Sequence, residues 1–145
     1  MKKIALITGA TSGIGEACAK KFGEAGYRLL VTGRNEERLA ALCRWLTHEG
    51  VDVLPLLFDV RDREAAAKEL DMLPARWREV DVLINNAGGA LGLEPAYMGD
   101  FKDWDTMIDT NIKGLLNMTR LIVPGMVKRN RGMVINIGSV AGDAA

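Results

Sequence analysis

The chain has 145 residues, of which 48% are hydrophobic and 26% are charged, a composition typical of a folded globular domain rather than of a disordered segment. Its 19 basic and 19 acidic residues cancel to a net charge of zero, so no basic surface for nucleic acid or anionic lipid is indicated. The apolar runs are too short to cross a bilayer. We therefore expect neither a nucleic-acid nor a membrane partner.

The cysteines and the histidine argue against disulfide and metal chemistry. Cys18 and Cys43 fall on apolar positions of predicted helices, which favours buried free thiols in a cytoplasmic protein over a disulfide. His48 is the single histidine. No cluster with metal-ligand spacing and no histidine-based triad can be assembled, so no metal is expected.

The stretch Lys3–Ala19, KIALITGATSGIGEACA, reads as strand, glycine turn and helix start. Glycines at Gly9, Gly13 and Gly15 let a backbone turn tightly and approach a ligand, and the free N–H groups of the first helical turn suit an anion such as a pyrophosphate. Their spacing is Gly-x-x-x-Gly-x-Gly, and a strand-to-helix turn without a ligand would show the same glycines. The alternation of strand and helix around them favours phosphate binding.

Strands and helices alternate along the rest of the chain. After the first apolar run, strands are predicted at Arg28–Thr32, Val51–Val60, Val80–Ile84 and Gly132–Ile137. Helices are predicted at Gly13–Ala25, from an Asn35 cap to Gly50, from an Asp62 cap to Leu70, and at Phe101–Lys128, with Ala90–Gly99 as a loop.

Local signals qualify three of these elements. The buried stripe of the first helix is predicted to contain Ile14, Ala17, Cys18, Phe22 and Ala25. Pro55 weakens the middle of its strand, and Pro124-Gly125 is expected to bend or interrupt the long helix.

This alternation predicts an α/β fold, a Rossmann-like doubly wound parallel sheet with helices on both faces. Ligands of such sheets bind at the carboxyl ends of the strands. Four strands end there in small or polar residues, at Thr8–Gly15, Gly33-Arg34, Asn85–Gly88 and Gly138-Ser139. This coincidence points to a nucleotide site along one edge of the sheet.

Together these residues resemble the short-chain dehydrogenase/reductase family over essentially the whole chain. The matching signatures are TGATSGIG at Thr8–Gly15, DV at Asp59-Val60, NNAG at Asn85–Gly88, Asn111 in the helix before the last strand, and Ser139 after it. Finer features, LGLEPA, DWDTMIDTNIKGLLNMTR and PGMVKRNRG, are similar to the branch of NADP-dependent 3-hydroxy acid (serine-type) dehydrogenases.

The resemblance assigns cofactor-binding roles. It implies that five residues surround the pyrophosphate and ribose: Gly9, Ser12, Gly13, Ile14 and Gly15. Asp59 would accept a hydrogen bond from the adenine amino group, with the Val60 backbone beside it, although a strand-end cap would look the same. Asn86, Ala87 and Gly88 would pass under the cofactor, although Asn and Gly are also common in plain turns.

The choice between NADP and NAD depends on Arg34, at the end of the second strand. A guanidinium there can bind a 2′-phosphate with two N–H groups, whereas a carboxylate would bind the 2′-hydroxyl and repel the phosphate. Arg34 could instead be a solvated arginine, with Glu36 or Glu37 serving NAD. The sequence favours NADP.

The resemblance also implies hydride transfer, with Ser139 binding the substrate oxygen and Asn111 maintaining a proton-relay water. Each could also be an ordinary polar residue. The family's tyrosine and the lysine four residues after it are absent, because Val31 and Phe101 follow Tyr27 and Tyr97 at that spacing. Residues 1–145 therefore look like a dinucleotide-binding domain truncated after the fifth strand, lacking the family's C-terminal strands, Tyr/Lys helix and substrate loop.

Three functions are compatible with this pattern: an oxidoreductase of small hydroxy acids, a ketone or sugar reductase on the same framework, and a non-catalytic dinucleotide-binding module. The resemblance implies a small-molecule substrate, with Leu91–Tyr97 as one wall of its pocket. It also implies a homodimer or homotetramer, for which the long helix is a candidate interface.

Overall fold

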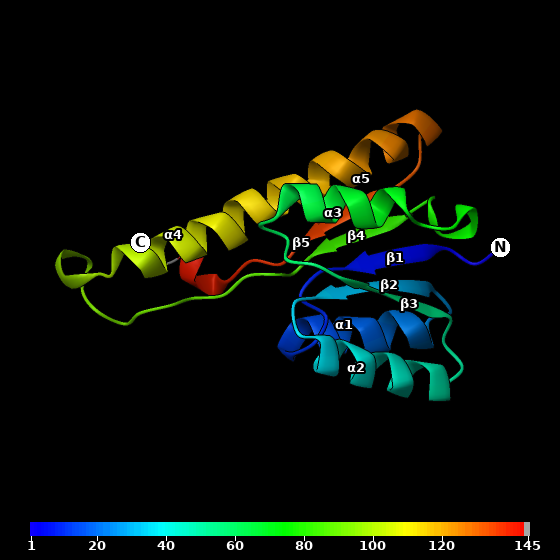
Figure 1. Cartoon of the computed structure of the whole chain (residues 1–145), viewed down its shortest axis with the longest axis horizontal. Coiled ribbons are helices and arrows are strands. Elements are labelled where there is room, and N and C mark those ends of the chain that lie inside the picture. Colours follow the sequence, from blue (N-terminus) through cyan, green and yellow to red (C-terminus); the bar gives the residue numbers. More distant parts are fainter. Residues whose placement is uncertain (144–145) are drawn as a thin grey trace.

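The computed structural model describes residues 1–143 and confirms the α/β fold (Figure 1). Its strands are β1 (Ile4–Ile7), β2 (Arg28–Gly33), β3 (Val53–Leu57), β4 (Val82–Asn85) and β5 (Met133–Asn136). Its α-helices are α1 (Gly13–Glu24), α2 (Glu36–His48), α3 (Arg63–Asp71), α4 (Phe101–Ile108) and α5 (Leu115–Arg129).

All five strands are parallel and lie in the order β3-β2-β1-β4-β5. The chain leaves β1 toward β2 and later returns on its other side as β4, so β1 and β4 flank the point where the strand order reverses. In open α/β sheets, ligands bind at the carboxyl ends of the strands beside this point. The topology therefore brings Thr8–Gly15 and Asn85–Gly88 together.

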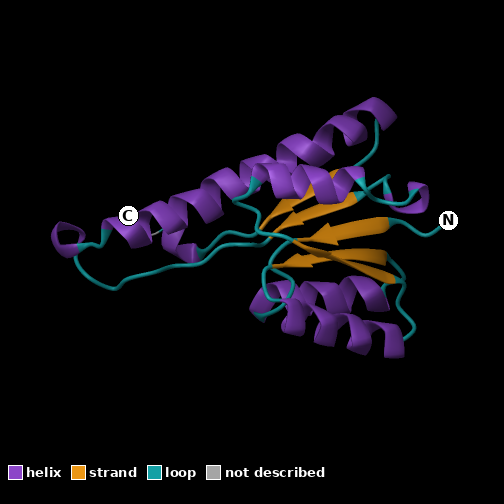
Figure 2. Ribbon diagram, viewed as in Figure 1, coloured by secondary structure: helices purple, strands orange, loops and turns teal. Residues whose placement is uncertain are grey.

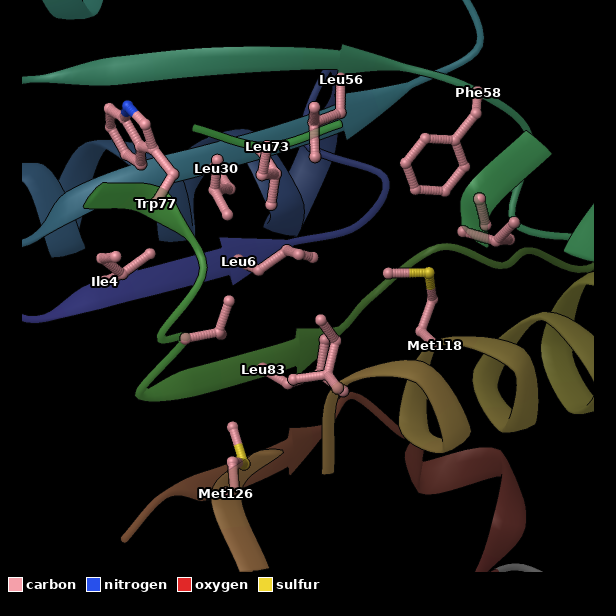
Figure 3. Packing of buried hydrophobic residues seen from close by; sticks show 14 residues of the cluster. Ile4, Leu6, Leu30, Leu56, Phe58, Leu73, Trp77, Leu83, Met118 and Met126 are labelled. Carbon is pink, nitrogen blue, oxygen red and sulfur yellow. The ribbon is translucent and has the colours of Figure 1, made fainter. Parts of the chain in front are cut away.

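Two apolar layers cover the sheet, with α1 and α2 on one face and α3 and α5 on the other (Figure 2). Alternation along β1 divides its side chains between the layers, so that the strand is buried on both faces as its unbroken apolar sequence predicts. Ile4 and Leu6 belong to the layer that contains Met118 of α5 (Figure 3), whereas Ala5 and Ile7 belong to the α1–α2 layer.

Helix caps are confirmed, but the predicted stripe of α1 is wrong in part. The side chains of Asn35 and Asp62 accept hydrogen bonds from the first turns of α2 and α3. In α1, Gly15 and Ala19 are buried, whereas Ile14, Ala17 and Ala25 are exposed. The periodic pattern predicted that the larger side chains of α1 are buried. The helix instead packs on the sheet through its small residues. Ile14 lines the cleft described below.

The long helix predicted at Phe101–Lys128 is not one regular α-helix. A π-helical segment, Asp109–Gly114, separates α4 from α5. α5 runs through Pro124 as one helix, so an interruption there, one of the two expected effects, is wrong. The carbonyl that proline leaves without its usual donor belongs to the exposed Arg120, where water can satisfy it. The helix ends at Asn130, whose φ of 54° is left-handed.

The strand predicted at Val51–Val60 is shorter, because β3 covers Val53–Leu57 and leaves Asp59 in the following turn. Pro55 stays within it, which is permitted because β3 is an edge strand. The opposite edge is β5, as expected for a sheet truncated after its fifth strand. There Met133 and Val134 are exposed apolar side chains.

Candidate functional site

A cleft of about 520 Å³ lies at the carboxyl ends of β1 to β4, where the topology predicts a ligand site. Four short segments supply most of its wall, each at or just after the carboxyl end of one strand. Its lining residues are Gly9, Thr11–Ile14, Thr32–Arg34, Phe58–Val60, Asn86–Gly89, Leu91, Thr106, Met107 and Thr110. The last three come from α4 and the π-helical segment, which extend beyond the sheet (Figure 1).

The turn after β1 is built so that backbone lines the cleft. Gly9 has a φ of 59°, a left-handed backbone angle that residues other than glycine rarely adopt. A Cβ on Gly15 would collide with the carbonyl oxygen of Gly9, so α1 approaches this turn closely only because residue 15 is glycine. Ser12 precedes α1 without capping it through its side chain. The N–H groups of the first helical turn therefore remain available to an anion in the cleft.

Thr8 and Asn86 join this turn to the segment after β4. The Thr8 hydroxyl accepts hydrogen bonds from the backbone N–H of Asn86 at 3.0 Å and of Ala87 at 2.9 Å. In return, the Asn86 side-chain amide donates to the carbonyls of Thr8 at 3.2 Å and Gly9 at 3.0 Å. Asn86 thus positions the glycine turn, and the backbone of Ala87 and Gly88 lies along the cleft.

Three charged side chains meet where the turns after β2 and β3 border the cleft. Arg61 binds the Asp59 carboxylate through Nε at 3.0 Å and Nη2 at 2.8 Å, and its backbone N–H donates to Oδ1 at 2.9 Å. Nη1 of Arg34 lies 3.8 Å from Asp59 Oδ2, and the Arg34 side chain is 67% exposed.

These neighbours decide the charge of Asp59. Partial burial acts to raise the pKa of its carboxyl, but the hydrogen bonds and charge of Arg61, together with the charge of Arg34, bring that pKa below its usual range. The same pairing raises the pKa of Arg61. Asp59 is therefore a carboxylate and Arg61 a cation at neutral pH, and Arg34 adds a second positive charge at the cleft.

The two residues expected to take part in chemistry, Asn111 and Ser139, are not among the residues that line this cleft. The Asn111 side chain, in the π-helical segment, accepts a hydrogen bond from the Gly89 N–H at 2.9 Å and donates to the Gly89 carbonyl at 2.8 Å. Ser139 is exposed after β5, and its Oγ accepts from the Ala141 N–H at 3.1 Å.

Most of the expected cofactor residues line one cleft: Gly9, Ser12, Gly13, Ile14, Arg34, Asp59, Val60, Asn86, Ala87 and Gly88. Gly15 is buried behind it, against Gly9. Sequence reasoning missed Arg61, although an arginine two residues after a strand-end aspartate was a usable signal. It also gave no role to Met107 and Thr110, which lie within the stretch DWDTMIDTNIKGLLNMTR and line the cleft from α4 and the π-helical segment.

The comparisons with known proteins agree with this architecture. The short chain dehydrogenase family description matches residues 3–145. The chain belongs to the short-chain dehydrogenase family. It is 56% identical over 139 residues to the NADP-dependent 3-hydroxy acid dehydrogenase of Salmonella typhi, covering 96% of this chain and 55% of that protein. It is 49% identical over 143 residues to sulfoacetaldehyde reductase 2 of Chromohalobacter salexigens, covering 98% of this chain and 56% of that protein.

Among solved structures, this chain is similar to the closed form of serine dehydrogenase complexed with NADP+, with a TM-score of 0.89 and 50% identity. That match covers 97% of this chain and 55% of the other. The chain therefore spans a little over half the length of the relatives it matches. Within residues 1–143, no helix is long and apolar enough to cross a membrane.

Proposed function

We propose that this chain forms the NADP-binding part of an oxidoreductase that transfers a hydride between NADP(H) and a small 3-hydroxy acid or the corresponding carbonyl compound. One observation carries the proposal: the cleft places a glycine turn, a helix N-terminus and Arg34 along one edge of the sheet. The similarity to a serine dehydrogenase crystallised with NADP+ supports the same cofactor.

The residues present fit a dinucleotide. Because residue 15 is glycine, α1 can approach Gly9 closely, where a Cβ would collide. Backbone N–H groups are then the surface that a pyrophosphate would meet. The Asp59 carboxylate is an acceptor for the adenine amino group, and Arg34 is an exposed donor for a 2′-phosphate. The bound cofactor would supply the hydride chemistry. The chain would bind it, shield it from water and orient it.

Asn111 and Ser139 receive proposed roles at the reacting end. The Gly89 backbone is held by Asn111, so this side chain would fix the loop that borders the substrate space. Ser139 would bind the substrate oxygen through its hydroxyl. In the structure this hydroxyl already accepts from Ala141, but its own proton remains available to donate.

A carbonyl reductase is the second candidate, because sulfoacetaldehyde reductase 2 is 49% identical to this chain. Steady-state rates of the full gene product should separate the two, with serine and other 3-hydroxy acids tested in one direction and aldehydes, ketones and sugars in the other. We expect kcat/KM to be highest for a 3-hydroxy acid. A product that turns over none of these compounds but binds dinucleotide would instead be a non-catalytic module.

The cofactor assignment is tested by Arg34→Ala. We expect the full gene product to bind NADP more tightly than NAD, and the variant to lose at least about tenfold of its NADP affinity, because a hydrogen bond to a charged group contributes about 1.5–3 kcal/mol. NAD affinity should change little. Fluorescence titration measures both constants. Equal affinity for the two cofactors, unaffected by the substitution, would contradict the phosphate role.

A further inference from the structure

The position of Asp59 raises an electrostatic difficulty for the proposed cofactor. Its carboxylate lies 3.8 Å from the guanidinium of Arg34, the group proposed to bind the 2′-phosphate. A phosphate on Arg34 would therefore stand close to a second anion. The carboxylate would repel that phosphate and compete with it for the same donors.

Arg61 lies where it can offset both the repulsion and the competition for donors. Its Nη2 donates to Oδ2 at 2.8 Å, its Nε lies within hydrogen-bond distance of both carboxylate oxygens, and its backbone N–H donates to Oδ1. These contacts place a positive charge directly against the Asp59 carboxylate and satisfy its lone pairs on the Arg61 side. Arg34 makes only the longer contact and is far more exposed, at 67% against 34% for Arg61. The two arginines are thus unequal: one is committed to the carboxylate and the other is free to reach a ligand.

We propose that Arg61 is a specificity-determining positioning residue, which neutralises Asp59 so that Arg34 can bind the 2′-phosphate of NADP. The inference rests on the proposed function and extends it to a residue that need not touch the cofactor. It predicts that loss of Arg61 weakens the binding of NADP more than the binding of NAD, because the uncompensated Asp59 carboxylate would repel the 2′-phosphate.

Two small probes isolate the phosphate: adenosine 2′,5′-bisphosphate and adenosine 5′-monophosphate, which differ only at the 2′ position. Calorimetric titration of the full gene product with each gives a selectivity ratio that does not depend on catalysis. For Arg61→Gln we expect binding of the bisphosphate to weaken about tenfold, or ~1.4 kcal/mol, and binding of the monophosphate to weaken less than twofold.

The decisive arm is rescue. Adding Asp59→Asn to Arg61→Gln removes the charge that Arg61 neutralised while keeping a side-chain acceptor, so the selectivity ratio should return to within about threefold of the wild-type value. Arg61→Lys keeps the positive charge but loses the planar guanidinium, so its selectivity ratio should lie between those of the wild type and Arg61→Gln. The matched control is Arg44→Gln, an exposed arginine of α2, which should leave the ratio unchanged. If circular dichroism shows Arg61→Gln to be unfolded, Arg61→Lys and the double variant carry the comparison.

Equal weakening of both probes by Arg61→Gln would assign Arg61 to the shape of the adenine pocket and overturn the inference, as would no weakening or a failed rescue. Arg34→Ala separates this failure from that of the proposed function. If Arg34→Ala leaves the selectivity ratio unchanged, the phosphate role of Arg34 itself is wrong. If Arg34→Ala abolishes selectivity while Arg61→Gln does not, only the role of Arg61 is wrong.

Discussion

At the scale of single residues, Thr8 has the most demanding position in the site. Its side chain is almost fully buried, accepts from two backbone N–H groups and donates to the Ile84 carbonyl at 3.4 Å. One hydroxyl therefore joins the ends of β1 and β4, beside the point where the strand order reverses. Few other side chains are small enough to fit there and still accept two hydrogen bonds.

Thr8→Val should therefore lower stability although it preserves shape. Two partly buried N–H groups lose their acceptor, and a fully buried unsatisfied group costs about 1–3 kcal/mol, so we expect a loss of about 1–3 kcal/mol in the free energy of unfolding. Thr8→Ser retains the acceptor and should cost much less. Chemical denaturation of both variants measures the difference. A valine variant as stable as the serine variant would show that water replaces the hydroxyl.

At the scale of elements, the π-helical segment and the loop after β4 form one unit. The Asn111 side chain accepts from the N–H of Gly89 and donates to its carbonyl, so it satisfies both backbone groups of that residue, as a neighbouring β-strand would. A Cβ on Gly88 would come within 2.5 Å of Asn111 Oδ1, which shows how closely the two segments approach. The helical distortion and the loop glycine are thus parts of one contact.

Asn111→Ala should release this loop with little effect on the sheet. Both bonds to Gly89 are exposed, so the cost in global stability should be about 1 kcal/mol or less. The Gly89 amide should then exchange with solvent at least about tenfold faster, as its local protection is lost. Hydrogen exchange measured by NMR would report this, with the Ile7 amide in β1 as an unaffected reference. Unchanged exchange at Gly89 would mean that the loop is held by other contacts.

Element order and the position of the cleft were predictable, because apolar runs, caps and strand-end polar residues are local signals. Asn35 and Asp62 cap their helices as their residue types predict. The π-helical segment was not predictable, since it arises where Asn111 meets a loop 22 residues earlier. The exposure of Ile14 was missed for a similar reason: its surroundings include segments after β4 and in α4 rather than its sequence neighbours.

At the scale of the whole molecule, the sheet has one apolar edge. Met133 and Val134 of β5 are exposed, as is Val127 near the end of α5. Together with Met126 and Gly132 they line a groove of about 400 Å³. An edge strand with unpaired backbone groups and apolar side chains favours association with other chains.

We therefore expect the 145-residue chain, produced alone, to be marginally stable or to self-associate. Sedimentation velocity across a concentration series should show species larger than a monomer, or urea should unfold the chain at a low midpoint. A monomer with a sharp, high-midpoint transition would contradict this expectation. Met133→Lys offers a control, because a charge on the edge strand should reduce association.

The proline in β3 bears on the form that such association would take. The Leu29 N–H donates to the Asp52 carbonyl, so the backbone polar groups of residue 52 face β2. Successive residues of a strand face opposite sides, so the backbone polar groups of residue 55 face away from β2, toward the open edge. Because residue 55 is proline, it offers no N–H to that edge. Head-to-tail polymers would need β3 of one copy to pair with β5 of the next, and the proline would deny that pairing one hydrogen bond. Pairing of β5 with β5 meets no proline, and it would be a two-fold arrangement that uses the open edge of both copies. We therefore expect such association to favour dimers over open-ended polymers.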